Sequence, residues 1–165
     1  MNDNSFIWTS EKDGYNHIYH YGKKGKLIRQ VTEGNWEVTA YYGYDKKSEK
    51  IYYQSVENGS INRGVYVIGL NGKNKQLLSK KEGTNSASFS ADFTYFINEF
   101  SNSTIPPEFS SFRIVAPHKV RQNPIKGYAT AGHRSHPRLR ELIQRIQPEG
   151  PPSLVGLLRL TNGPL

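Results

Sequence analysis

Four serines of this chain are candidate nucleophiles, and they occur in turns and apolar segments: Ser60, Ser86, Ser88 and Ser90. A serine nucleophile of the α/β-hydrolase type needs a Gly-x-Ser-x-Gly turn, which exposes the Oγ beside an oxyanion hole. None of these serines has the two flanking glycines, and the pattern is absent from the whole sequence. The sequence therefore predicts no catalytic residue, and we interpret these serines as structural.

Histidines are the next candidates, either as bases or as metal ligands. His17 and His20 are three residues apart in a segment with strand character, so they point to opposite faces and cannot share one metal ion. We expect His17 to lie beside a turn and His20 to lie at the surface. A second set, His118, His133 and His136, has no fourth ligand, and the chain has no cysteine. The sequence thus predicts no metal site and no cofactor.

Carboxylates and aromatic side chains are the remaining candidates, as acid–base groups and as ligand-stacking surfaces. Glu33, Glu37, Asp45 and Asp92 recur where sheets are expected to begin, and there carboxylates commonly accept hydrogen bonds from turn N–H groups. We interpret them as turn residues rather than as acid–base groups. Large aromatic side chains could stack on a ligand, but packing between sheets is the favoured interpretation. They are Trp8, Trp36, Tyr41, Tyr42, Tyr52 and Tyr53.

The elements that carry these residues are short and rich in Tyr, Val, Ile, Phe and Trp, and each is bounded by Gly, Asn, Asp or Lys. This pattern is typical of β-strands joined by tight antiparallel turns. We predict strands near Phe6–Thr9, His17–Tyr21, Leu27–Thr32, Trp36–Tyr42, Lys50–Ser55, Gly64–Leu70, Lys75–Ser79, Ala87–Ser90 and Tyr95–Phe100.

The predicted strands also repeat. Lys26–Gly34 is echoed by Lys75–Gly83 at an offset of 49, whereas Tyr19 matches Tyr66 at an offset of 47. A repeat of this length holding about four strands has the size of one β-propeller blade. The predicted fold is therefore all-β, an incomplete β-propeller of about two to three four-stranded antiparallel blades. A β-sandwich stays open as an alternative, although it does not explain the period.

Composition changes sharply after Phe109. The chain has 165 residues and a net charge of +8, but residues 1–109 hold 13 Lys and Arg against 12 Asp and Glu, and residues 110–165 hold 9 against 2. All nine prolines lie at Pro106 or later. We expect a propeller fragment at 1–109 and a basic, Pro/Arg-rich tail at 110–165. The tail is expected to be disordered or to form one short, irregular helix near 136–147, and a frameshift or a fusion would explain it.

Several consecutive strings resemble one family. The run from Phe6 to Tyr19, Gly34–Thr39, Tyr42–Asp45 and Lys50–Ser55 are similar to the propeller of the dipeptidyl peptidase IV family, prolyl-oligopeptidase-type serine peptidases. The likeness extends through Ser88–Asp92 and Pro106–Pro107, and its tyrosine- and lysine-rich style resembles bacterial members.

The resemblance implies part of a propeller that limits peptide access to a hydrolase domain. In the intact homologue that domain would release N-terminal dipeptides from peptide substrates and would supply the Ser, Asp and His. The family's paired substrate-binding glutamates have no match here, so no binding residue is carried over. We expect this chain to be inactive alone, without its hydrolase domain.

Location and partners follow from the same expectations. A periplasmic or cell-envelope location is implied by the family only, because the N-terminus has no basic and apolar leader. No apolar run is long enough for a membrane span. Open blade faces predict self-association.

The alternative function is a non-enzymatic interaction module whose basic tail binds an acidic partner or nucleic acid. Its candidate cations are Arg113, Lys119, Arg121, Lys126, Arg134, Arg138, Arg140 and Arg145. Only Phe112 and Tyr128 of the tail could stack on bases, which makes nucleic acid the less favoured partner.

Overall fold

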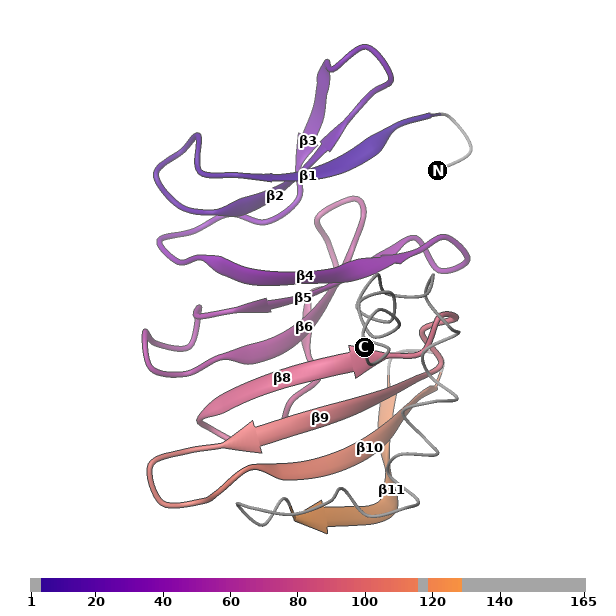
Figure 1. Cartoon of the computed structure of the whole chain (residues 1–165). Coiled ribbons are helices and arrows are strands. Elements are labelled where there is room, and N and C mark those ends of the chain that lie inside the picture. Colours follow the sequence, from indigo (N-terminus) through magenta and orange to yellow (C-terminus); the bar gives the residue numbers. More distant parts are fainter. Residues whose placement is uncertain (1–3, 116–118, 129–165) are drawn as a thin grey trace, which may run out of the picture.

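The computed structural model describes residues 4–115 and 119–128, which form three antiparallel sheets with no helix in these ranges. The strands run in chain order through the three sheets, which lie one after another (Figure 1). Their bounds are β1 Phe6–Ser10, β2 His17–Tyr21, β3 Leu27–Gln30, β4 Val38–Asp45, β5 Lys50–Ser55, β6 Gly64–Gly69, β7 Gln76–Leu77, β8 Thr84–Phe89, β9 Tyr95–Ser101, β10 Glu108–Val115 and β11 Lys119–Tyr128. Since no helix lies in the described part of the chain, none there could span a membrane.

Each sheet is a meander of neighbouring strands. Sheet 1 has the order β1-β2-β3, sheet 2 the order β4-β5-β6-β7, and sheet 3 contains β8 to β11 in sequence order. Of the nine predicted strands, the first three lie in sheet 1 and the next four in sheet 2, which are the numbers of strands that these sheets contain. Sheet 3 differs, because it has four strands and only the last two predicted strands lie in it.

The extra strands of sheet 3 correct the expectation for the start of the tail. The predicted boundary after Phe109 falls inside β10, and β10 pairs with β9 from Glu108↔Phe100 to Arg113↔Tyr95. Backbone hydrogen bonds form the ladder irrespective of whether the cations are lysine or arginine, so the change in composition does not end the sheet. The helix expected near 136–147 lies outside the described residues.

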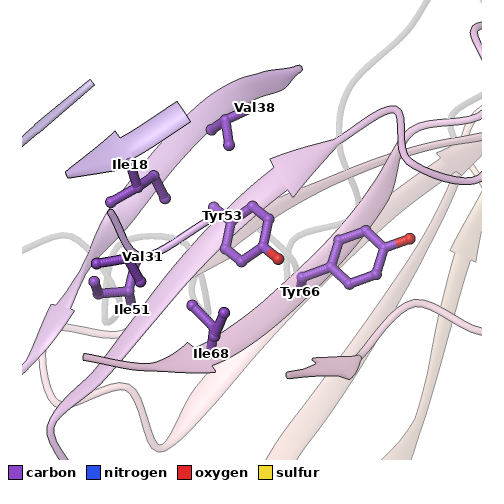
Figure 2. Close-up of a cluster of buried hydrophobic side chains, with 7 residues drawn as sticks. All are labelled: Ile18, Val31, Val38, Ile51, Tyr53, Tyr66 and Ile68. Atoms are coloured by element: carbon purple, nitrogen blue, oxygen red, sulfur yellow. The ribbon is translucent and has the colours of Figure 1, made fainter. Parts of the chain in front are cut away.

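Sheet 2 is buried on both faces because it lies between the other two. On one face, side chains of sheet 2 pack against Ile18 and Val31 from the sheet 1 side. The sheet 2 residues of this cluster are Val38, Ile51, Tyr53, Tyr66 and Ile68. Figure 2 shows the rings of Tyr53 and Tyr66 next to each other, and their centroids lie 5.5 Å apart in a stacked arrangement. This cluster, core 1, joins sheets 1 and 2.

The other face of sheet 2 builds a second cluster, core 2. Tyr52, Val65 and Val67 pack there with Phe96 and Phe112 of sheet 3. Successive strand residues point to opposite faces, which explains why Tyr52 belongs to core 2 and Tyr53 to core 1. It also explains why β5 and β6 are nearly continuous apolar runs without a polar alternation.

Sheets 1 and 2 repeat with an offset of 47 in their hydrogen bonding. Tyr19 pairs with Gln30 as Tyr66 pairs with Leu77, and the N–H of Val31 donates to Ile18 as that of Leu78 donates to Val65. The sequence echo of Lys26–Gly34 at an offset of 49 is therefore two residues out of structural register. Each stretch contains the last strand of its sheet, β3 or β7, and two edge strands can resemble each other in sequence without being equivalent residue by residue.

Candidate functional site

The four candidate serines occupy structural positions. Ser60 is exposed in the turn between β5 and β6. Ser86 donates to the Glu99 carboxylate on the neighbouring strand over 3.3 Å, and Ser88 is exposed on β8. The hydroxyl of Ser90 donates to Asp92 over 2.7 Å and accepts the N–H of Tyr95. The hydroxyls of Ser86 and Ser90 are thus engaged with carboxylates in the sheet and its turn, and a purely structural role for the four serines stays a prediction.

His17 is fully buried and both of its ring nitrogens are engaged. Its Nε2 lies 2.9 Å from the carbonyl oxygen of Gly34, which can only accept, so Nε2 carries the proton. Its Nδ1 lies 3.2 Å from Oγ1 of Thr32, which in turn accepts the N–H of Ile18. The ring also meets Trp36 edge-on, with centroids 4.9 Å apart. His17 therefore connects the start of β2 to the segment between sheets 1 and 2.

His20 corrects one expectation, because it is only 8% exposed rather than at the surface. It shares with Ile18 the face of sheet 1 that is turned toward sheet 2, and its Nε2 lies 2.8 Å from Oγ of Ser5. In the described ranges, no group of three or more His, Cys, Asp or Glu side chains is arranged to hold a metal ion.

Two of the four carboxylates act in turns, as predicted. Asp45 accepts the N–H of Lys47 over 2.9 Å and the hydroxyl of Ser48 over 2.6 Å. Asp92 accepts the hydroxyl of Ser90 and both the N–H and the hydroxyl of Thr94. These hydrogen bonds lower the pKa of Asp92 to about 2. Glu33 and Glu37 are exposed.

The large aromatic residues divide into packed and exposed groups. Trp36 stacks on Tyr53 with centroids 6.4 Å apart, and Tyr52 stacks on Phe93 at 4.8 Å. Burial raises the pKa of the Tyr52 hydroxyl to about 12. The hydroxyl of Tyr42 crosses from sheet 2 to accept the N–H of Ala87 over 3.1 Å. Packing between sheets is thus observed for these residues.

Trp8 and Tyr41 do not follow that pattern. Trp8 is 63% exposed and Tyr41 is 42% exposed, so neither is enclosed between two sheets of this chain. Trp8 lies on β1, opposite Tyr19. The Trp8 side chain lies on the face of sheet 1 that is turned away from sheet 2.

A buried polar network between sheets 2 and 3 was not predicted. Asn85, which is 1% exposed, donates through Nδ2 to the carbonyls of Lys81 at 2.9 Å and Arg63 at 3.1 Å. Its Oδ1 accepts the Nδ2–H of Asn98 at 3.0 Å, and its backbone carbonyl accepts Nε2–H of Gln54 at 2.5 Å. An asparagine inside a short polar strand gives no sequence signal for such a role, because the same pattern occurs on exposed strands.

Two open clefts lie at the rims of these interfaces. One, of about 480 Å³, lies between sheets 2 and 3, and Arg63, Lys80 and Lys81 line it together with Glu82. The other, of about 420 Å³, lies between sheets 1 and 2 and is lined by Arg29, Lys73, Trp36 and other residues. Lys81 is paired with Glu108, so part of this positive charge is already neutralised.

The predicted nucleic-acid or acidic-partner surface is only partly described. Arg113 and Arg121 lie opposite each other on β10 and β11, and both are exposed. The guanidinium of Arg113 lies 5.8 Å from the ring centroid of Tyr95. Arg134, Arg138, Arg140 and Arg145 lie outside the described residues, as do His118, His133 and His136. Binding by the tail stays a prediction.

Comparison with known proteins places this arrangement in a family. A profile of the dipeptidyl peptidase IV (DPP IV) N-terminal region matches residues 1–107. Dipeptidyl peptidase 4 of Arthroderma otae is 34% identical over 103 residues, and that of Trichophyton rubrum is 33% identical over the same length. Each alignment covers 61% of this chain and 13% of the fungal protein, so the chain spans about an eighth of these relatives.

A solved structure extends the likeness to the fold. The crystal structure of Porphyromonas gingivalis dipeptidyl peptidase 4 is 38% identical and superposes with a TM-score of 0.67, covering 88% of this chain and 19% of that one. This structure comes from a bacterium, whereas the curated relatives named above are fungal, so a bacterial origin of the chain stays a prediction. The three successive antiparallel sheets are accordingly part of a β-propeller, and this chain belongs to the dipeptidyl peptidase IV family, within the N-terminal region.

Proposed function

We propose that this segment forms part of the propeller wall of a dipeptidyl peptidase, which restricts access of peptide substrates, and that it contributes no catalytic group. The observation that carries this proposal is that the side chains best suited to catalysis in this segment are already engaged in structural hydrogen bonds. His17, Asp92 and Ser90 are engaged in hydrogen bonds within and between the sheets. The release of N-terminal dipeptides would be the activity of the intact protein.

The proposed role requires rigidity more than chemistry. A wall must keep its blades in fixed relative positions, and here two apolar cores and the Asn85 network connect the three sheets. The buried side-chain amides of Gln54 and Asn85 donate to the backbone carbonyls of Asn85 and Lys81, respectively. This arrangement stabilises the position of each blade relative to the next.

A chimera tests the proposal. Residues 4–109 would replace the aligned segment of P. gingivalis dipeptidyl peptidase 4, and hydrolysis of Gly-Pro-p-nitroanilide would be measured. We expect kcat to stay within about tenfold of the parent, because a correctly packed wall leaves the reacting groups in place. A chimera that shows the parent's circular dichroism and cooperative melt but does not hydrolyse the substrate would contradict the role as an interchangeable wall.

The claim that the segment contributes no catalytic group has its own test. The 165-residue chain, incubated alone with the same substrate, should give no release of nitroaniline above buffer. His17→Gln and Ser90→Ala serve as variants for any signal that is found. Hydrolysis by the chain that is lost in either variant would overturn the assignment.

A further inference from the structure

The turns at one end of sheets 1 and 2 carry a group of exposed lysines, which we call the lysine rim. The turns are the β2–β3, β4–β5 and β6–β7 connections. The lysines are Lys23, Lys24, Lys26, Lys46, Lys47 and Lys73, and all six residues are exposed. The two ion pairs found among the described residues use Lys75 and Lys81 instead. The charge of the lysine rim is therefore presented to solvent.

The β2–β3 and β6–β7 turns have the same geometry. In the first, the N–H of Gly22 donates to the carbonyl of Lys26 over 2.9 Å. In the second, at the offset of 47 that relates the two sheets, the N–H of Gly69 donates to the carbonyl of Lys73 over the same distance. Lys26 and Lys73 therefore occupy equivalent places in successive sheets.

The β4–β5 turn meets the β6–β7 turn at this end of sheet 2. The N–H of Leu70 donates to the carbonyl of Glu49 over 2.8 Å, and the carboxylate of Asp45 accepts the N–H of Lys47 over 2.9 Å. Figure 1 shows the β4–β5 turn at the right of the molecule and the β5–β6 connection at the left. The lysines thus lie on short, hydrogen-bonded turns of a single rim.

The opposite rim differs in the sign of its charge. Its exposed acidic residues are Glu11, Asp13, Glu33, Glu37 and Glu82, and its exposed cations outside the two ion pairs are Lys12, Arg63 and Lys80. On the lysine rim, the six lysines lie with the acidic residues Asp45, Glu49 and Asp92. The described sheets are therefore polarised from rim to rim, although residues 1–109 hold 13 Lys and Arg against 12 Asp and Glu.

We propose that the lysine rim binds the surface of an anionic phospholipid membrane. A cluster of about four to eight basic residues has the size that binds anionic lipid headgroups. Because the lysine-bearing turns end at the same rim, one flat surface can contact several of them at once. These turns contain no aromatic residue that could stack on bases, which favours lipid over single-stranded nucleic acid.

The same charge distribution sets the orientation of the bound chain. The acidic residues of the opposite rim lie on the side away from the membrane, where the negative surface repels them least. Binding of this kind is independent of the proposed role as a propeller wall.

Cosedimentation of the 165-residue chain with sucrose-loaded vesicles tests the proposal. Vesicles of phosphatidylcholine mixed with phosphatidylglycerol are compared with vesicles of phosphatidylcholine alone. We expect binding to the anionic vesicles only, and added salt should weaken it because the attraction is electrostatic. The basic residues after Phe109 are present in every variant, so their contribution cancels in the comparison between variants.

Two variants that lose the same three positive charges separate position from net charge. The rim variant carries Lys23→Gln, Lys24→Gln and Lys46→Gln. The control variant carries Lys12→Gln, Arg63→Gln and Lys80→Gln on the opposite rim, where all three residues are exposed. The rim variant should bind anionic vesicles at least roughly 30-fold more weakly than the unsubstituted chain, and the control variant less than about threefold more weakly.

Three outcomes would overturn the proposal. Equal losses in the two variants would show that binding follows net charge and not the lysine rim. Absence of binding at low salt, or equal binding to vesicles of phosphatidylcholine alone, would exclude an anionic membrane as the partner. In a parallel arm with a labelled single-stranded oligonucleotide, a larger loss for the rim variant than on vesicles would identify nucleic acid as the partner instead.

Discussion

Replacement of Asn85 by alanine should loosen the contact between sheets 2 and 3 more than its small volume suggests. Asn85 links the two sheets through its side chain, which donates to the carbonyls of Arg63 and Lys81 and accepts from Asn98. A more distant carbonyl, that of Gly83, lies 3.4 Å from the same Nδ2. Removing the amide leaves the buried Asn98 side chain and the Lys81 carbonyl without these partners.

The magnitude follows from the number of bonds and their burial. Each intramolecular hydrogen bond contributes about 1 kcal/mol net, and a buried group left without a partner costs about 1–3 kcal/mol. The Arg63 carbonyl keeps the backbone N–H of Asn85, which lies 2.9 Å away and limits the loss there. We therefore expect Asn85→Ala to lower the free energy of unfolding by about 2–4 kcal/mol.

Urea unfolding followed by circular dichroism, at one chain concentration, measures this change. Asn58→Ala is the control, because Asn58 is exposed in a turn and the same substitution there should cost less than about 1 kcal/mol. The double variant with Asn98→Ala should be less destabilised than the sum of the two single variants, since both remove the same hydrogen bond. A loss for Asn85→Ala no larger than that for Asn58→Ala would refute the structural role of this network.

Three further outcomes are expected. Phe96→Ala, at a fully buried ring that stacks on Phe112, should cost about 3–5 kcal/mol in urea unfolding, whereas Tyr95→Ala on the 40% exposed neighbour should cost less than about 1 kcal/mol. Gly83→Ala should destabilise more than Gly25→Ala in thermal melts, because both have positive φ but a Cβ at Gly83 would lie 2.7 Å from the Ser101 carbonyl oxygen while one at Gly25 meets nothing. The lowered pKa of Asp92, about 2 in the folded chain against 3.8, means that its contribution is present above pH 4 and is lost between pH 4 and pH 2. Asp92 is exposed, so solvent screening keeps this effect small. The urea midpoint of Asp92→Asn should therefore depend less on pH between pH 4 and pH 2 than that of the unsubstituted chain. An unchanged pH dependence would contradict the assignment.

Sequence reasoning located nine strands because the local signals are strong: β-branched and aromatic runs bounded by Gly, Asn and Lys. It misplaced some ends, since β4 begins at Val38 and not at Trp36, whose indole packs on His17 and Tyr53 instead of continuing the ladder. The family and fold followed from the combination of a blade-sized repeat with the resemblance around Phe6–Tyr19.

The errors have physical causes. The boundary after Phe109 was inferred from composition, whereas β10 forms through backbone pairing with β9. The sequence predicts His20 at the surface because the alternation of side chains along a strand puts it on the other face from His17. That alternation does not tell which of the two faces a neighbouring sheet covers. The Asn85 network depends on contacts across more than twenty residues, which periodicity does not report.

Adjacent tyrosines on β5 have a consequence for how sheet 2 finds its pairing. Sliding β5 by one residue would still give each apolar core a tyrosine, but it would also move Gln54 into the place of Tyr53 or Lys50 into the place of Ile51, both core positions. The neighbouring Gln54 also distinguishes the native alignment from the shifted ones, since only the native alignment lets it accept the hydroxyl of Thr39 and donate to Asn85. Gln54 thus helps to fix the alignment of the central blade twice, through its own hydrogen bonds and through the cost of placing its amide in the core.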